Sequence, residues 1–289
     1  MSRPVRVQAR AAVVLALASA ASLAAFFWPL FVPAQPEAVA RTADAPLIFV
    51  VLLPVLVAVM VAELIDGGLD TKAVAMLGVL SAVNAALRPL GAGTAGIETV
   101  FFLLVLAGRV FGPGFGFLLG STSLFASALL TAGVGPWLPF QMLAASWVGL
   151  GAGLLPRRLT GRAEIAMLTG YAAVSAYAYG FHMNMWFWPF SPAADTQLSY
   201  LAGAPLLENL HRFVLFTATT SSLGWDTGRA ITNGVAVAVL GGAVLAVLRR
   251  AARRAAFDAP IAFTTAAVAD TERATAQRAG LDPGLELPP

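Results

Sequence analysis

The sequence predicts an all-α integral membrane protein with eight spans. Of its 289 residues, 58% are hydrophobic and only 11% are charged, whereas a soluble domain carries about 25% charged residues to cover its surface. Apolar runs near the length of a membrane-spanning helix, about 20 residues, recur along the chain. The positive charges also fall unequally on the two sides of these runs, as the positive-inside rule describes.

The first predicted span is the uncharged run 11–32, which follows three arginines. A signal peptide cleaved near Ala38–Ala40 is the alternative. Its apolar region would have about 7–15 residues, and this run has 22. We therefore expect a retained helix, which forms an N-terminal hairpin (residues 1–72) with a second span over 46–65.

Six further spans follow from the lengths of the apolar runs and from the residues that interrupt them. They cover residues 73–90, 97–111, 114–132, 138–155, 163–181 and 228–248. We expect these spans to form a core over residues 73–254. The remainder, 255–289, is rich in Ala, Thr and Pro and is predicted to be a disordered cytoplasmic tail.

Eight spans place both termini on one side of the membrane, and the distribution of Lys and Arg tests this expectation. Twelve of these residues lie on the N-terminal side: Arg3, Arg6, Arg10, Lys72, Arg109, Arg157, Arg158, Arg162, Arg249, Arg250, Arg253 and Arg254. Four lie on the opposite side: Arg41, Arg88, Arg212 and Arg229. The bias predicts a multi-pass protein of the plasma membrane with both termini in the cytoplasm.

The longest external segment, 182–227, is rich in aromatic and apolar residues. Connections of this length are usually functional or carry their own secondary structure. We expect a re-entrant or interfacial helix around 207–221 that caps the outer face. The alternative is a ninth span at 210–223, which has too few residues to cross a bilayer and would place the basic cluster after Leu248 outside the cell.

Several classes of activity have no support in the motifs. The absence of cysteine excludes disulfides and Cys-ligated metals. The only lysine, Lys72, is not in a P-loop, and the G-x-G-x-x-G pattern at 91–96 joins two membrane helices rather than a strand and a helix. Neither His182 nor His211 lies in a zinc motif. We expect no enzyme activity, cofactor, metal or nucleic-acid partner.

Polar and aromatic residues near the external ends of the helices are the candidates for a binding site. A polar side chain in hydrocarbon is costly and is a functional hypothesis by default, although Trp also forms interfacial belts and Arg also snorkels. The candidates are Asn84, Arg88, Trp137, Phe140, Gln141, His182, Asn184, Trp186, Trp225, Asp226 and Arg229. We expect an outward-facing pocket in which Arg88 meets an anionic or carbonyl group, tryptophans stack on a ring and amides fix its orientation.

Small residues recur at four-residue spacing in two of the predicted helices. One ladder holds Ala12, Ala16, Ala20 and Ala24, and the other holds Gly78, Ala82 and Ala86. Such faces allow helices to approach closely in lipid. Each ladder predicts either internal packing or a docking face for a separate membrane subunit.

Three glycine-rich stretches resemble a known transporter family. They are VFGPGFGFLLGS at 110–121, GVGPWLPFQML at 133–143 and GLGAGLL at 149–155, and the segment LGWDTGRAITN at 223–233 fits the same group. Over about 73–250, the chain resembles the substrate-specific S components of energy-coupling factor (ECF) transporters, particularly an actinobacterial-type group.

The resemblance implies a fold, partners and a function. Family members have six core helices, so residues 1–72 would be an extra hairpin. The S component binds a vitamin from outside and topples within an assembly of one transmembrane coupling (T) subunit and two cytoplasmic ATPases. An alanine-rich face of the first core helix contacts the T subunit; by position this is the ladder at Gly78, with the ladder at Ala12 as the second candidate. Our first expectation for the substrate is cobalamin or a related corrinoid, because a large aromatic cover suits a bulky ligand.

Two alternatives belong to other classes of protein. A self-contained proton-coupled transporter would need an acidic relay near the midplane, and Glu63, Asp66, Glu98 and Glu208 all fall near span ends. A non-transporting membrane scaffold is the second alternative.

Overall fold

The computed structural model describes residues 9–31, 71–91, 96–135, 137–191, 196–201 and 203–255, together with the isolated positions 55, 58, 59 and 62. All of these residues belong to one compact unit, Met1–Phe257. The second predicted span, 46–65, lies almost wholly outside the described residues. The predicted tail lies outside them except for Ala255.

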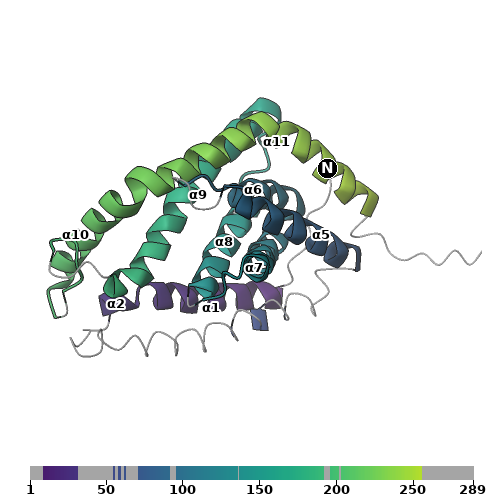
Figure 1. The fold of residues 1–289 in the computed structure, drawn as a ribbon. Helices are drawn as coiled ribbons and strands as arrows, with labels where there is room; N and C mark the ends of the chain where they lie inside the picture. Colours follow the sequence, from purple (N-terminus) through teal and green to yellow (C-terminus); the bar gives the residue numbers. More distant parts are fainter. Residues whose placement is uncertain are drawn as a thin grey trace, which may run out of the picture. The chain divides into compact units, whose positions relative to one another are not determined.

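Every regular element in the described part of the chain is helical, which confirms the predicted fold class (Figure 1). The helices are α1 (Ala9–Phe26), α2 (Trp28–Phe31), α5 (Thr71–Leu87), α6 (Val100–Phe111), α7 (Pro113–Leu130), α8 (Leu138–Leu154), α9 (Gly161–Phe187), α10 (Leu206–Thr217) and α11 (Thr227–Ala255). Two 3-10 turns, η1 (Arg88–Leu90) and η2 (Trp188–Phe190), extend α5 and α9, and a π-helix, η3 (Ala218–Asp226), joins α10 to α11. Each of the six predicted core spans corresponds to one helix, from α5 to α9 and α11.

Three described helical stretches are long and apolar enough to cross a membrane: Ala9–Phe26, Pro113–Leu130 and Leu206–Arg254. The apolar helices α5, α6 and α8 are shorter. A helix of 12 residues such as α6 is about 18 Å long, less than the hydrocarbon thickness of about 30 Å. All of its residues are buried, so α6 is enclosed by its neighbours. The number of spans stays a prediction.

Glycines lie where α6, α7 and α8 meet. A Cβ atom added at Gly149 of α8 would meet the carbonyl oxygen of Gly116 in α7, and one added at Gly108 of α6 would meet the carbonyl of Gly149. A Cβ at Gly153 would likewise meet the backbone at Pro113. Close backbone contact supplies much of the van der Waals energy that holds helices together in lipid. These three helices therefore form the most tightly packed part of the bundle.

A buried ion cluster joins α6, α9 and α11 at one end of the bundle. Arg109 Nε donates to Glu164 Oε1 at 2.7 Å, and Arg249 Nη2 donates to both carboxylate oxygens of Glu164 at 2.6 and 2.8 Å. Arg109 also donates to the carbonyl oxygens of Leu155 and Leu159. Because the Arg109 and Glu164 side chains are only 5% and 3% exposed, the cluster fixes the three helix ends relative to one another.

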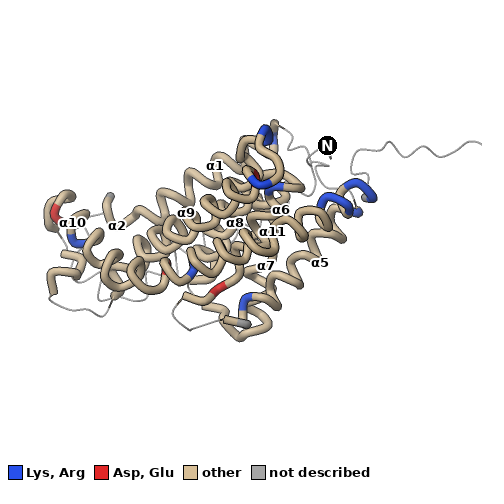
Figure 2. Tube along the Cα trace, turned by 90° about the horizontal axis from the view of Figure 1, so that it is seen from above, with Lys and Arg blue, Asp and Glu red and all other residues tan. Residues whose placement is uncertain are grey.

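The charged residues lie near the ends of helices, and most of the tube in Figure 2 is uncharged. Arg109, Arg157 and Arg249, which were predicted on one side, lie at the same end of the bundle. The pKa of Arg157 is lowered because partial burial and the like charge of Arg109 disfavour its charged form. Arg88 and Arg229 lie at the other end, beside Glu98. Which end faces the cytoplasm stays a prediction.

The predicted external segment, 182–227, is largely helical. Helix α9 continues to Phe187, six residues beyond its predicted end, because no helix breaker occurs before Pro189. From Leu206 to Arg254 the chain forms one uninterrupted helix. The predicted re-entrant form of the cap and a separate ninth span at 210–223 are therefore both wrong, since each requires the chain to reverse within this described stretch.

The predicted capping helix corresponds to α10. The continuous helix of 49 residues is about 70 Å long, and a whole bilayer with its headgroups measures about 40–45 Å, so part of the helix extends beyond the hydrocarbon. Phe213 and Phe216 of α10 pack against Met185 and Trp188 at the end of α9. This small apolar cluster holds α10 against α9.

The N-terminal helix α1 packs directly on the core. Phe26 is fully buried, with its ring centroid 4.9 Å from that of Phe140 and 5.4 Å from that of Trp147. Trp147 Nε1 also donates to Ser19 Oγ at 3.1 Å. Helix α1 therefore covers part of α8 and α9 and contributes side chains to the hydrophobic core.

We predict that the contact between α7 and α8 does not tolerate a methyl group. Gly149→Ala should lower the free energy of unfolding by about 1–3 kcal/mol, because the two backbones must separate to admit it. The matched control is Gly170→Ala, also in a helix, where an added Cβ meets nothing within 4 Å. The measurement is the thermal unfolding of both variants in detergent. If Gly149→Ala and Gly170→Ala both had the melting temperature of the wild type, the packing argument would be contradicted.

Candidate functional site

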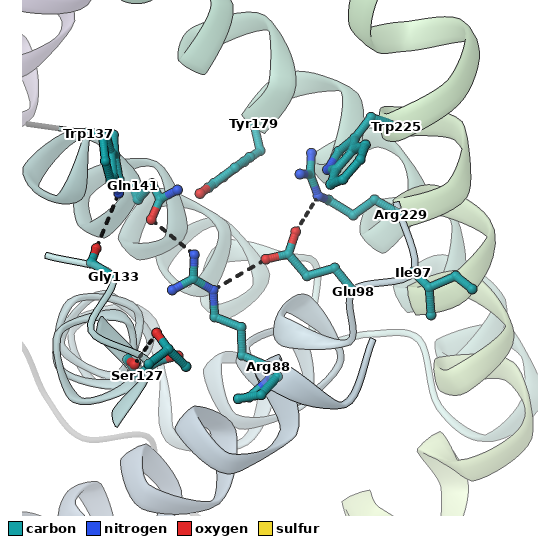
Figure 3. A pocket seen from close by; sticks show the side chains of 12 residues that line it. Arg88, Ile97, Glu98, Ser127, Gly133, Trp137, Gln141, Tyr179, Trp225 and Arg229 are labelled. Carbon is teal, nitrogen blue, oxygen red and sulfur yellow. Dashed lines mark hydrogen bonds and ion pairs between the residues drawn. The ribbon is translucent and has the colours of Figure 1, made fainter. Parts of the chain in front are cut away.

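A polar cavity of about 270 Å³ lies at the end of the bundle opposite the Arg109 cluster (Figure 3). The helices alternate in direction, so the ends of α5, α7 and α9 meet the beginnings of α6, α8 and α11 at this place. The lining residues are Arg88, Pro89, Ile97, Glu98, Ser127, Thr131, Gly133, Trp137, Gln141, Tyr179, Trp225 and Arg229.

Glu98 connects the two arginines of the cavity, as Figure 3 shows. Its Oε2 accepts a hydrogen bond from Arg229 Nε at 2.8 Å, and its Oε1 lies 3.5 Å from Arg88 Nε. Arg88 Nη2 donates in turn to Gln141 Oε1 at 3.1 Å. This chain of polar contacts joins the end of α5 to the beginnings of α6, α8 and α11.

Arg229 is held on its other side by Asp226, the last residue of the π-helix. Asp226 Oδ1 accepts from Arg229 Nη1 at 3.0 Å, and Oδ2 accepts from the hydroxyls of Ser221 and Ser222 at 2.9 and 3.1 Å. The Arg229 guanidinium also lies 5.0 Å from the centroid of the Tyr179 ring, within the range of a cation–π interaction. Asp226 is completely buried, so it orients Arg229 from behind the cavity wall.

The segment that precedes α6, residues 96–99, packs against the beginning of α11. Gly96 has φ +77°, and a Cβ there would meet the carbonyl of Trp225, so both its conformation and its surroundings favour glycine. Asn233 Nδ2 donates to the carbonyl of Glu98 at 2.6 Å, and its Oδ1 accepts from the backbone N–H of Phe102 at 2.8 Å. The second bond strengthens the first turn of α6, because the Phe102 N–H otherwise has only a bond of 3.2 Å to the carbonyl of Thr99. Together these contacts set the position of the Glu98 carboxylate.

Two tryptophans give the cavity its aromatic surface. Trp137 and Trp225 are 44% and 41% exposed, and exposed Trp rings are common near the helix ends of membrane proteins. Trp137 Nε1 donates to the carbonyl of Gly133 at 3.2 Å, and its ring lies so close to Gly135 that a Cβ there would collide with it. The ring of Trp137 is thus held in place although it is half exposed.

Five of the predicted binding residues line the cavity, namely Arg88, Trp137, Gln141, Trp225 and Arg229. Asp226 lies behind it, bound to Arg229. Asn84 does not line it: this residue is completely buried and donates from Nδ2 to Ser123 Oγ at 3.0 Å.

The other four predicted residues belong to the packing between α8, α9 and α10. Phe140 stacks on Trp186 with 4.5 Å between ring centroids and 6° between ring planes. His182 Nδ1 donates to the carbonyl of Ala178 at 2.7 Å, and its ring faces a separate hollow of about 160 Å³. Asn184 Nδ2 lies 3.5 Å from Thr217 Oγ1, which accepts from it. A role for these residues in substrate binding stays a prediction.

Four polar residues of the cavity were not among the predicted ones: Glu98, Ser127, Thr131 and Tyr179. The position of Glu98 in the sequence indicated only an acidic residue near the end of a span. The hydroxyls of Ser123, Ser127 and Thr131 recur every four residues, so their shared face on α7 was a signal in the sequence. Nothing in the sequence around Tyr179 indicated that α9 would turn this ring toward the cavity.

The structure thus describes an all-helical membrane protein with a polar cavity of small-molecule size at one end of its bundle. No group of three His, Asp or Glu side chains suited to a metal ion occurs among the described residues. A family model for the substrate-specific component of ECF transporters matches residues 72–248. No curated protein and no solved structure matches the chain.

The chain belongs to the family of ECF transporter substrate-specific components, because the match covers more than half of it and extends from α5 into α11. Such components are substrate-binding membrane proteins rather than enzymes, and they pair with a T component and ATPases. The family expected from the glycine-rich stretches is confirmed, and the actinobacterial-type subgroup stays a prediction.

We predict that Glu98 keeps the two arginines of the cavity from acting as an anion site. Glu98→Gln should cost about 1–3 kcal/mol of stability, because Arg88 and Arg229 lose a shared carboxylate in a partly buried place. Sulfate should then raise the melting temperature of the variant more than that of the wild type, since a ligand stabilises the state that binds it.

Glu208→Gln is the control for this measurement. Glu208 pairs with Arg212 on the exposed face of α10, and such pairs contribute about 0–1 kcal/mol. An equal response to sulfate in Glu98→Gln and Glu208→Gln would contradict the proposed role of Glu98.

Proposed function

We propose that the protein is the substrate-capturing S subunit of an ECF-type importer in the plasma membrane. Its ligand is a vitamin or another small micronutrient that enters the cavity beside Arg88 from outside the cell. The observation that carries the proposal is this cavity, which gathers aromatic, amide and guanidinium groups where six helices of the family core meet.

The lining residues support a division of roles within the cavity. The half-exposed rings of Trp137 and Trp225 are suited to stack on a ring of the ligand. Arg88 Nε is 3.5 Å from Glu98, a loose pair that leaves the guanidinium available to a carbonyl group of the ligand. Gln141, bonded to Arg88, orients the same part of the ligand.

The size of the cavity favours a small ligand. Sites for drug-sized molecules are commonly about 300–1,000 Å³, and this cavity has about 270 Å³. A corrinoid has a macrocycle of four pyrrole-derived rings and is much larger than this space. The cavity therefore gives no support to cobalamin, and we propose a ligand with one or two rings.

Two exposed faces are candidates for contact with the T subunit. Gly78, Ala82 and Ala86 all lie on the exposed side of α5, and an added Cβ at Gly78 meets nothing within 4 Å. The ladder of Ala12, Ala16 and Ala20 is likewise exposed on α1. We propose the α5 face as the docking site, because α5 is the first helix within the family match.

We predict that Trp137→Ala weakens ligand binding by about tenfold or more, because it removes a stacking surface from the cavity. The measurement is calorimetric titration of the full chain in nanodiscs with a panel of water-soluble vitamins. Phe125→Ala is the matched control, since Phe125 is 45% exposed but does not line the cavity. Failure of every panel member to bind tighter than about millimolar would contradict the capture function.

Transport in proteoliposomes separates this proposal from a self-contained transporter. Uptake should require the T subunit, both ATPases and ATP. Uptake by this chain alone, driven by a proton gradient, would overturn the proposal.

We predict that a bulky residue on the docking face blocks assembly and leaves ligand binding intact. Ala82→Leu should lower co-purification with the T subunit and ATPases by about tenfold or more, because leucine keeps the helices apart. Ala16→Leu on α1 is the matched control. Loss of assembly in Ala16→Leu but not in Ala82→Leu would assign docking to α1.

A further inference from the structure

The charges around the cavity balance one another. Arg229 is bound by Glu98 and Asp226, and Arg88 shares Glu98. Two guanidinium groups thus face two carboxylates, and only the Arg88 pair is longer than 3.0 Å. An anionic ligand loses its hydration when it enters a partly buried site, and this loss costs free energy. The site has no net positive charge that would compensate for that cost.

Two hydroxyl groups in the cavity remain without a partner among the described residues. Ser127 is completely buried, and its Oγ makes no hydrogen bond. The Tyr179 side chain, on a residue 6% exposed, points its hydroxyl toward Gln141 and Arg88 (Figure 3). The carboxylates of Glu98 and Asp226 and the hydroxyl of Thr131 each have a partner. A buried hydroxyl without a partner costs free energy, so a ligand that bonds to the Ser127 hydroxyl removes that cost. The Tyr179 hydroxyl, which is not among the fully buried atoms, is a second group open to a hydrogen bond with the ligand.

We propose that the cavity selects an uncharged ring compound with hydrogen-bonding groups, and that Ser127 and Tyr179 are specificity-determining residues that bond to it. The inference rests on the proposed capture function and names the substrate class of the same site. Ser127 comes from α7 and Tyr179 from α9, so a ligand bonded to both spans the cavity. Its ring lies against the half-exposed Trp137 and Trp225, and a carbonyl group reaches Arg88 without displacing Glu98.

The test compares neutral and anionic forms of the same ring. Full-length protein in nanodiscs is titrated with nicotinamide and nicotinate, pyridoxine and pyridoxine 5′-phosphate, and biotinamide and biotin. In the pair that contains the tightest binder, the neutral member should bind at least about tenfold more tightly. Ser127→Ala and Tyr179→Phe should each weaken its binding by about three- to tenfold, the effect of one hydrogen bond.

Two control variants remove hydroxyls from the same helices outside the cavity. Ser121 of α7 is buried and bonded to Ser146 at 2.5 Å, and Tyr171 of α9 donates to the carbonyl of Val148 at 2.8 Å. Ser121→Ala and Tyr171→Phe should leave the dissociation constants unchanged. Because Ser127 has no bond to lose, Ser127→Ala should also melt at or above the wild-type temperature.

The outcomes separate this inference from the function on which it rests. Tighter binding of the anionic member, or unchanged binding in both Ser127→Ala and Tyr179→Phe, would overturn the neutral-ligand inference while capture itself stands. Failure of all six compounds, together with failure of the wider vitamin panel, would remove the capture function and this inference with it.

Discussion

The hydrocarbon of a bilayer offers no hydrogen-bond partner to a buried polar group, and the arrangement of this bundle follows from that constraint. Polar side chains inside the protein must satisfy one another, and the buried ion pairs lie at its two ends. At one end Glu164 binds Arg109 and Arg249. At the other end Glu98 lies between Arg88 and Arg229. Each carboxylate thereby joins helices that are far apart in the sequence.

The two ends differ in how completely their polar groups are paired. Arg109 donates to two backbone carbonyls as well as to Glu164. The end at Glu98 leaves a cavity, two half-exposed tryptophans and hydroxyls without partners. A polar network in which every group has a partner makes a structure rigid. A ligand gains the most binding free energy where it can bond to groups that have no partner. The difference between the ends explains why recognition is proposed at only one of them.

The π-helix η3 connects α10 to the cavity. π-Helical segments are rare and often occur at functional sites. Here the segment ends at Asp226, which holds Arg229, and it brings Trp225 to the cavity. The same helix carries α10, whose phenylalanines pack on the end of α9. The cavity and the α10–α9 contact are therefore connected through one continuous helix.

The sequence alone determined the helical class, the six core helices and the family, because lipid requires long apolar runs and glycine-rich contacts leave readable patterns. It also placed Arg88, Trp137, Gln141, Trp225 and Arg229 near one end, since apolar helices keep their polar residues at their ends. Only the tertiary structure decided which polar groups pair. Tyr179 and Ser127 reach the cavity through the rotation of α9 and α7 about their axes. The contact of Gly116 with Gly149 restricts the rotation of α7, and the contact of Gly180 with Asp226 restricts that of α9. The uninterrupted helix through residues 206–254 was also a tertiary outcome, because the packing of α10 on α9 stabilises a helix where polar and glycine residues indicated a break.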